Sequence, residues 1–230
     1  STCDFTYNHY QNMLNEALKQ GHNVSSLGHY FENPSPGKTV LLRHDIDLSV
    51  RKARIMAQIE KEIGVSATYF VRLHALYNLN NVRNLEALRD LTHWGHEIGL
   101  HYEAEIYLNG KKKLAKSLSD DKKLLEHILG EPVKGVSIHS VTRLREIYNV
   151  DDDAFLQTAQ NLFDYSASSP IFHKDFKYLS DSNRYWRDDC LCRHIGNKGR
   201  LYILIHPFWW AATSLPVITL IEDAIRGETL

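Results

Sequence analysis

Cysteine is scarce in this chain, which contains only three, at positions 3, 190 and 192. An odd number cannot all be paired, and Cys190 and Cys192 are too close in sequence for an ordinary disulfide. A disulfide-stapled scaffold is therefore excluded, and a reducing, cytoplasmic compartment is favoured. No second ligand pair accompanies Cys190 and Cys192 in the sequence, so we do not expect a thiolate zinc site.

Long apolar runs and an excess of charge are missing as well. No run approaches the roughly 20 residues of a membrane-spanning helix, and no positively charged, apolar leader is present. The formal net charge of −1 and the pI near 6.9 argue against a surface that binds nucleic acid or an anionic membrane. The chain begins with Ser1 rather than methionine, so we expect leading residues to be missing or processed.

What is present suits a globular protein. The 230 residues are 43% hydrophobic and 24% charged, enough for one sizeable core, and we predict a single domain over 1–230. Strand patterns alternate with amphipathic helix patterns, which is typical of parallel βαβ units in an α/β fold. Strands are predicted over 38–44, 65–73, 96–101, 134–139 and 201–205, with shorter candidates at 162–166 and 176–179. Helices are predicted over 7–20, 49–64, 84–94, 111–129, 151–161 and 215–225, and a polar loop over 180–199.

Two acidic residues, Asp45 and Asp47, stand at the end of the strand predicted over 38–44. Side chains alternate along a strand, so both carboxylates project to the same side. They repel each other unless a cation or a proton lies between them, so one can hold a metal while the other accepts a proton. The alternative is that Asp47 or Ser49 only caps the helix that follows.

Histidines stand at the ends of the later strands, at His74, His101, His139 and His206. In parallel α/β folds the functional residues gather at the carboxyl ends of the strands. Polar strand ends meet water in any protein, but recurrence of ionisable residues at one strand end after another is better explained by a site.

The segment around His101 offers further metal ligands. Glu105 follows His101 by four residues and lies beside it if the chain turns helical, whereas Glu103 reaches it if the chain stays extended. Carboxylate oxygens and imidazole nitrogens suit Zn²⁺, with Mn²⁺ or Fe²⁺ as alternatives.

Several ordered motifs resemble those of the polysaccharide deacetylases, carbohydrate esterase family 4. The histidine motif is the most specific of them, and together they span residues 38–207. The matching segments are His44-Asp45-Ile46-Asp47, residues 64–71, Gly95-His96-Glu97-Ile98-Gly99-Leu100-His101 and Leu204-Ile205-His206-Pro207.

The resemblance implies a distorted (β/α) barrel with about seven parallel strands. It also implies a metal-dependent hydrolase that removes an N-acyl group from a sugar, with N-acetyl as the expected group. The expected setting is glycan or surface polysaccharide biosynthesis. In this reading Asp45 matches the general base and His206 the general acid. Asp47 and His101 match ligands of a divalent metal, Zn²⁺ in the first instance.

The chain departs from the family pattern at two places. The second metal histidine would fall at position 105, where this chain has Glu105, with Glu103 as the alternative ligand. The arginine-containing third motif is not evident, and His139 stands in that region as a supporting residue. The segment with Asp181, Trp186 and Arg187 loosely resembles the fourth motif, which surrounds the base.

Two residues have roles predicted from their chemistry. We expect Arg187 to keep Asp45 ionised, because an adjacent cation lowers the pKa of a carboxylate. Trp209 follows His206 closely and is expected to pack against the apolar face of a sugar ring.

Two other functions stay open because of Glu105 and the missing third motif. One is a non-catalytic carbohydrate-binding protein on the same scaffold. The other is a metal-independent hydrolase of a different amide that uses Asp45 and His206. The expected partner in each reading is a small molecule or carbohydrate and not a nucleic acid.

Overall fold

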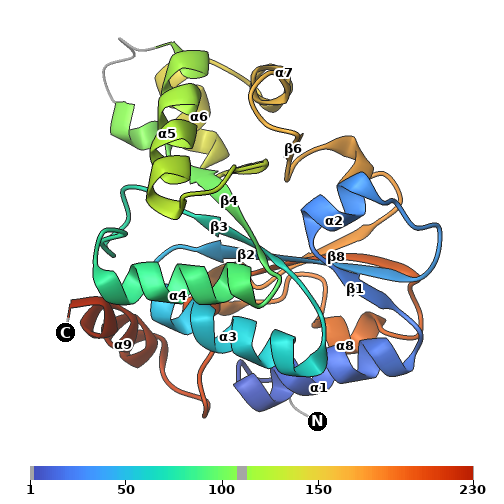
Figure 1. The fold of residues 1–230 in the computed structure, drawn as a ribbon. Helices are drawn as coiled ribbons and strands as arrows, with labels where there is room; N and C mark the ends of the chain where they lie inside the picture. The colour runs from blue at the N-terminus through green and yellow to red at the C-terminus, as the bar shows by residue number, and fades with distance from the viewer. Residues whose placement is uncertain (1–2, 108–112, 230) are drawn as a thin grey trace.

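The computed structural model describes residues 3–107 and 113–229 (Figure 1). Its centre is a parallel sheet with the strand order β6-β5-β4-β3-β2-β8-β7, and the short β1 pairs with the start of β2. The strands are β1 (Asn23–Ser25), β2 (Thr39–Ile46), β3 (Thr68–Val71), β4 (Glu97–Tyr102), β5 (Gly135–Ile138), β6 (Tyr165–Ser166), β7 (Lys177–Ser180) and β8 (Arg200–Ile205).

Helices surround the sheet. Helices α1, α4 and α9 pack against α3, and these four form a layer along one side of the sheet (Figure 1). The α-helices are α1 (Tyr7–Lys19), α2 (Leu27–Glu32), α3 (Val50–Ile63), α4 (Val82–His93), α5 (Leu114–Leu129), α6 (Val141–Tyr148), α7 (Asp152–Gln160), α8 (Leu191–His194) and α9 (Val217–Thr229). The short 3-10 helices are η1 (Ala104–Tyr107), η2 (Pro170–Phe172), η3 (Ser182–Arg184) and η4 (Pro207–Trp209).

The sheet curls without closing, since β6 pairs with β5 at one end and β7 pairs with β8 at the other. The seven strands of the main path and their covering helices confirm the predicted distorted (β/α) barrel. No helix in the described part of the chain is long and apolar enough to cross a membrane.

Strand β2 runs through the middle of the molecule, and all eight of its residues are buried. Its successive side chains enter different apolar clusters. Val40 and Leu42 belong to the larger cluster, which includes residues of α1 and α3, while Leu41 packs with Phe70 and Tyr202 in the smaller one. This alternation sends Arg43 and Asp45 to the same side as Leu41 and sends His44 toward the helices.

The helix-facing side of β2 carries a buried polar network around Glu60 of α3. The carboxylate lies 2.6 Å from His44 Nε2 and accepts a hydrogen bond of 2.8 Å from the Tyr69 hydroxyl. Tyr10 of α1 also donates to it, and His96 Nδ1 lies 3.3 Å away. His44 is therefore a packed residue that links β2 to α3, on the opposite face from Asp45.

The predicted strands and long helices are present, with ends shifted by a few residues. The predicted start of the helix over 111–129 lies outside the described residues, and α5 is seen from Leu114. Sequence patterns missed β1, α2 and α6, because elements of three to eight residues are too short to show a clear period. The expected loop over 180–199 contains η3 and the four-residue α8.

Candidate active site

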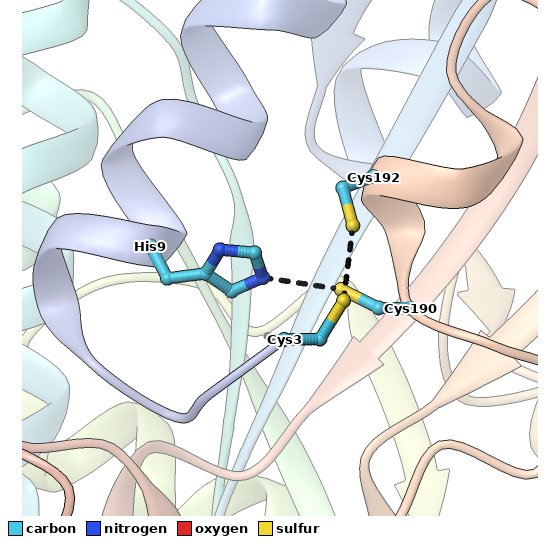
Figure 2. Close-up of side chains that lie close together, drawn as sticks. All are labelled: Cys3, His9, Cys190 and Cys192. Atoms are coloured by element: carbon cyan, nitrogen blue, oxygen red, sulfur yellow. Dashed lines mark hydrogen bonds between the residues drawn. The ribbon is translucent and has the colours of Figure 1, made fainter. Parts of the chain in front are cut away.

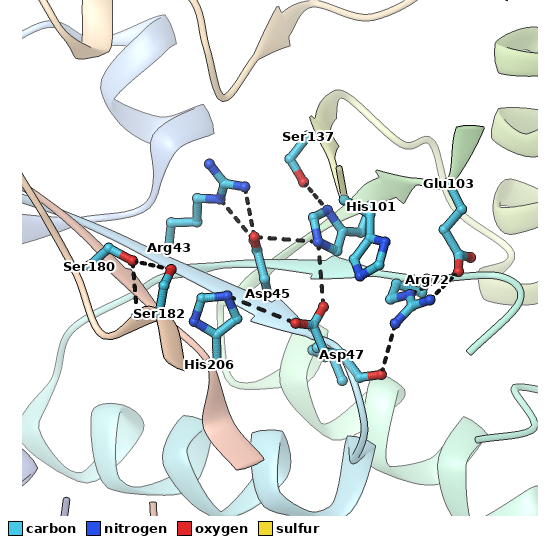
Figure 3. Close-up of polar contacts among 12 residues, drawn as sticks. Arg43, Asp45, Asp47, Arg72, His101, Glu103, Ser137, Ser180, Ser182 and His206 are labelled. Carbon is cyan, nitrogen blue, oxygen red and sulfur yellow. Dashed lines mark hydrogen bonds and ion pairs between the residues drawn. The ribbon is translucent and has the colours of Figure 1, made fainter. Parts of the chain in front are cut away.

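The end of β2 holds a paired carboxylate, Asp45 (Figure 3). Arg43 lies two residues earlier on the same strand face, and its Nε and Nη2 donate hydrogen bonds of 2.8 and 2.7 Å to the two oxygens of Asp45. Burial alone would raise the pKa of Asp45, but the Arg43 guanidinium, together with His101 and His206, outweighs it and holds this pKa below the ordinary value. Asp45 is therefore an ionised carboxylate with a fixed orientation.

His101 of β4 lies between the two carboxylates of β2. Its Nε2 is 3.4 Å from Asp45 Oδ2 and 3.5 Å from Asp47 Oδ1. On the other side of the ring, Nδ1 is 2.7 Å from the hydroxyl of Ser137 on the neighbouring strand β5. Burial raises the pKa of Asp47, but the neighbouring imidazole of His101, together with His206 and His139, lowers it well below its usual range. The predicted pair of carboxylates thus shares one histidine.

His206 follows β8 and is held by Asp181, a fully buried residue that follows β7. Asp181 Oδ1 lies 2.7 Å from His206 Nδ1, and both of its oxygens accept the backbone N–H of His206. Trp210 Nε1 donates a hydrogen bond of 2.8 Å to Asp181 Oδ2. Burial lowers the pKa of His206, but the Asp181 carboxylate, together with Asp45 and Asp47, more than reverses this and the pKa rises to about 9. The free nitrogen, Nε2, is 3.9 Å from Asp47 Oδ2.

The two glutamates after β4 have partners other than His101. Glu103 Oε1 accepts hydrogen bonds of 2.8 and 2.6 Å from Arg72, and its Oε2 accepts the backbone N–H of His74 at 2.8 Å. Glu105 Oε1 lies 2.5 Å from Nδ1 of His139, whose ring meets that of His101 edge-on with centroids 5.4 Å apart. Glu103 is thus fully engaged in a buried salt bridge, while Glu105 keeps one oxygen for another partner.

Two orphaned oxygens bear on the predicted metal. Asp47 Oδ1 and Glu105 Oε2 are buried and lack a hydrogen-bond partner among the described residues. A buried oxygen without a partner is costly, and a cation that contacts it removes the cost. Asp47 Oδ1 also faces the imidazole of His101, and this combination of donors suits Zn²⁺ or Mn²⁺. The residues present therefore fit a divalent cation bound by Asp47 and His101.

The remaining predicted residues lie farther from this cluster. Arg187 is exposed, and the cation against Asp45 is Arg43, so the expectation that Arg187 keeps Asp45 ionised is corrected. Trp186 is buried and stacks on Phe5 with ring centroids 6.2 Å apart. Trp209 is half-buried, and its backbone N–H donates a hydrogen bond of 3.1 Å to the carbonyl of His206.

Sequence reasoning missed three residues of the site. Arg43 could have been found, because it precedes Asp45 by two residues on a strand and must share its face. Ser137 and Trp210 gave no such signal, since their partners His101 and Asp181 lie on other elements.

No protein-family model matches the chain, and no curated protein matches it. Solved structures do match. A family 4 carbohydrate esterase from Bacillus anthracis aligns at 14% identity over 94% of this chain and 86% of its own, with a TM-score of 0.48. The chitin deacetylase of the fungus Colletotrichum lindemuthianum aligns at 16% identity over 82% of this chain and 81% of its own, with a TM-score of 0.47. The deacetylase PplD of Streptococcus pyogenes aligns at 16% identity over 66% and 67%, with a TM-score of 0.48.

Proposed function

We propose that the chain is a metal-dependent amide hydrolase that removes an N-acyl group, N-acetyl in the first instance, from a sugar. The observation that supports this is His206, whose pKa of about 9 keeps the ring protonated at neutral pH beside the ionised carboxylates Asp45 and Asp47. The pKa values of the two carboxylates are lowered and that of the histidine is raised, so a base and an acid stand side by side at neutral pH. Acid–base catalysis requires such a pair. Amide hydrolysis needs both a base for water and an acid for the leaving amine.

Asp47 and His101 are the proposed metal ligands. Glu105 is preferred over Glu103 as the third, because Glu105 has an oxygen without a partner while Arg72 occupies Glu103. When bound, the cation would polarise the acyl oxygen and lower the pKa of water. Zn²⁺ fits these donors, and Mn²⁺ and Fe²⁺ are alternatives.

The side chains of the protein supply the proton transfers. Asp45 accepts the proton of the attacking water, and Arg43 keeps it ionised and correctly turned for that step. Nε2 of His206 donates a proton to the leaving amine nitrogen as the carbon–nitrogen bond breaks. Asp181 holds the opposite side of the ring, so that the proton of the acid points toward Asp47 and the reacting bond.

The mouth of the site would bind the sugar. Trp209 is half-buried beside His206, and an aromatic face of this kind packs well against the apolar face of a pyranose ring. The side chain of His139 is 25% exposed and is available to a sugar hydroxyl group. We propose that the substrate belongs to glycan or surface polysaccharide biosynthesis. A cytoplasmic location is proposed because all three cysteines are free thiols. We also propose that the whole chain is one catalytic domain.

The test is acetate release from N-acetylated sugars by protein stripped with chelator and reloaded with Zn²⁺, Mn²⁺ or Fe²⁺. We expect metal to restore activity, and we expect Asp47→Ala and His206→Gln to lose it. Asp90→Asn is the control, because Asp90 pairs with Arg54 at the surface. Hydrolysis that survives both chelation and Asp47→Ala would contradict the proposal.

A further inference from the structure

A second cluster of potential metal ligands forms where the amino-terminal segment meets the start of α8 (Figure 2). It contains Cys3, His9 of α1, and Cys190 and Cys192 at the start of α8. The sequence offered no second ligand pair for Cys190 and Cys192, which is why no thiolate zinc site was expected. The fold supplies that pair from the other end of the chain, so the reason for the expectation is removed.

The spacing of the four ligand atoms is that of a metal site. Cys3 Sγ is 3.2 Å from Cys192 Sγ, and His9 Nε2 is 3.4 Å from Cys190 Sγ. All four ligand atoms lie within 4.8 Å of one another. In a tetrahedral site with Zn–S bonds of about 2.3 Å the ligand atoms are about 3.7 Å apart, so small side-chain rotations suffice. Three sulfurs and one imidazole form a complete structural zinc set.

The ligand-bearing segment is held in place by contacts that do not use the four ligand atoms. The backbone N–H of His9 donates to the Thr6 hydroxyl at 3.1 Å, and Thr6 in turn donates to Asp4 at 2.7 Å, so the first turn of α1 is fixed. Backbone hydrogen bonds join Phe5 and Tyr7 to Ala211 on both sides of Thr6. A site assembled on such anchors loses little conformational freedom when a cation binds.

A cation can reach the cluster from solvent. A hollow lined by residues of α1 and the amino-terminal segment opens directly onto His9 and Cys192. Asp4 and Glu16 stand in the same hollow, and their carboxylates favour the approach of a cation. Cys3 and Cys190 face a second hollow on the side of Trp186.

We propose that Cys3, His9, Cys190 and Cys192 bind a structural Zn²⁺ that joins the amino-terminal segment to α8. Phe5 lies between Cys3 and α1, and it packs against both Trp186 and Trp210. Trp210 is the residue that donates to Asp181. The zinc would therefore stabilise the packing of Phe5 against the two tryptophans, one of which contacts Asp181. This effect does not depend on a metal at Asp47 and His101.

The first test uses Co²⁺ as a spectroscopic substitute for Zn²⁺ in the reduced wild-type protein. Thiolate-to-cobalt charge-transfer absorption is expected, and only the cysteine cluster can produce it, because the donors at Asp47 and His101 contain no sulfur. The absorption should persist in Asp47→Ala and should disappear on addition of Zn²⁺. Its absence from reduced wild-type protein would overturn the proposal without any need for a variant.

The second test counts bound zinc. We expect Asp47→Ala with His101→Ala to retain one equivalent and Cys190→Ser with Cys192→Ser to lose it. His9→Gln should weaken zinc binding at least about tenfold, since loss of a group that merely supports a ligand already costs about 10–100-fold. His29→Gln, an exposed histidine, is the matched control. Unchanged zinc content in the cysteine variant, or a Cys3–Cys192 disulfide with no metal in protein kept under reductant, would contradict the proposal.

The third test is thermodynamic. The test uses Asp47→Ala, so that zinc at Asp47 and His101 does not contribute, and the histidine variants are made in the same background. With free zinc one hundred times above the dissociation constant of the cysteine cluster, the unfolding equilibrium constant of Asp47→Ala should fall about a hundredfold. The same addition should lower the unfolding equilibrium constant of His9→Gln at most about tenfold, because its zinc binding is at least about tenfold weaker. An equal response of His9→Gln and His29→Gln would assign the stabilisation to some other site.

Discussion

At the scale of single residues, Asp181 is the carboxylate that raises the pKa of His206 most. Its carboxylate contacts Nδ1 and the backbone N–H of His206, and Trp210 donates to one of its oxygens. Burial alone lowers the pKa of a histidine, so a buried imidazole without a carboxylate partner would be neutral at neutral pH. A neutral imidazole has no acidic proton to donate and could not act as the general acid. The pKa of about 9 therefore depends on a residue that does not itself face the substrate.

The alkaline limit of activity should follow this pKa. A general acid must be protonated, so kcat/KM should fall as pH rises through about 9. In Asp181→Asn the stabilising charge is gone while burial remains, so the fall should begin at lower pH. His206→Gln should reduce kcat/KM about 10²–10⁴-fold at all pH values, the usual contribution of an acid. Rate profiles from about pH 5 to pH 10 measure all three.

The exposed His93→Gln is the control for these variants and should leave the profile unchanged. An alkaline limb that Asp181→Asn does not move would show that another group sets it.

The pair of Arg43 and Asp45 should matter for stability as well as for chemistry. Their side chains are only 10% and 4% exposed, so Arg43→Met leaves a carboxylate buried without its cation. That loss should cost about 3–5 kcal/mol of unfolding free energy, measured by urea denaturation at pH 7. The double variant with Asp45→Asn no longer has an unpaired buried carboxylate, so it should recover part of the lost unfolding free energy.

Arg54→Met breaks an exposed pair with Asp90 and is the matched control, with an expected cost below about 1 kcal/mol. Equal effects at the two sites would mean that burial of the Arg43 pair is unimportant.

At the scale of elements, the two faces of β2 carry two different polar networks. Its site face carries Arg43 and Asp45, and its helix face carries His44, which contacts Glu60 of α3. Glu60 also accepts hydrogen bonds from Tyr10 of α1 and Tyr69 of β3. One buried carboxylate thus joins two helices to two adjacent strands, and the register of β2 is fixed from both of its faces.

Glu60 should make the fold sensitive to acid. Burial raises its pKa, but His44 and the other partners outweigh this and hold the pKa below the ordinary 4.5. Its contribution to stability is therefore present above about pH 4.5 and is lost as pH falls through the lower folded-state pKa. Glu60→Gln should flatten the decline of unfolding free energy below about pH 4.5, as measured by urea denaturation across pH.

Glu86→Gln on the exposed side of α4 is the comparison and should keep the acid slope of the wild type. The same slope in both variants would remove Glu60 as the cause.

At the scale of the whole molecule, some of the site could be predicted from the sequence and some could not. Asp45, Asp47, His101 and His206 were predicted to lie together because the ends of parallel strands meet at one edge of a sheet and because these residues match motifs of the family that the sequence resembles. The pairing of His206 with Asp181 depends on β7 lying beside β8, which no local pattern reveals. The cysteine cluster joins residues 189 positions apart, so its sequence signal is split between the two ends of the chain.

The amino-terminal segment should influence the pKa of His206, the proposed general acid, through Phe5. Phe5 stacks on Trp186 and meets Trp210 edge-on at 5.2 Å, and its backbone carbonyl accepts the N–H of Ala211. In Phe5→Ala the loss of this half-buried ring should cost about 1–3 kcal/mol, somewhat less than truncation of a fully buried phenylalanine. Trp210 then has room to shift, and its hydrogen bond to Asp181 weakens.

A purely structural role would lower stability and leave the pH profile alone. If Phe5 supports the acid, Phe5→Ala lowers kcat more than it changes KM and moves the alkaline limb of activity below that of the wild type. Phe5→Leu fills most of the space and should restore both, because the contact with Trp210 is largely one of packing. A normal alkaline limb in Phe5→Ala would confine the amino-terminal segment to holding the fold together.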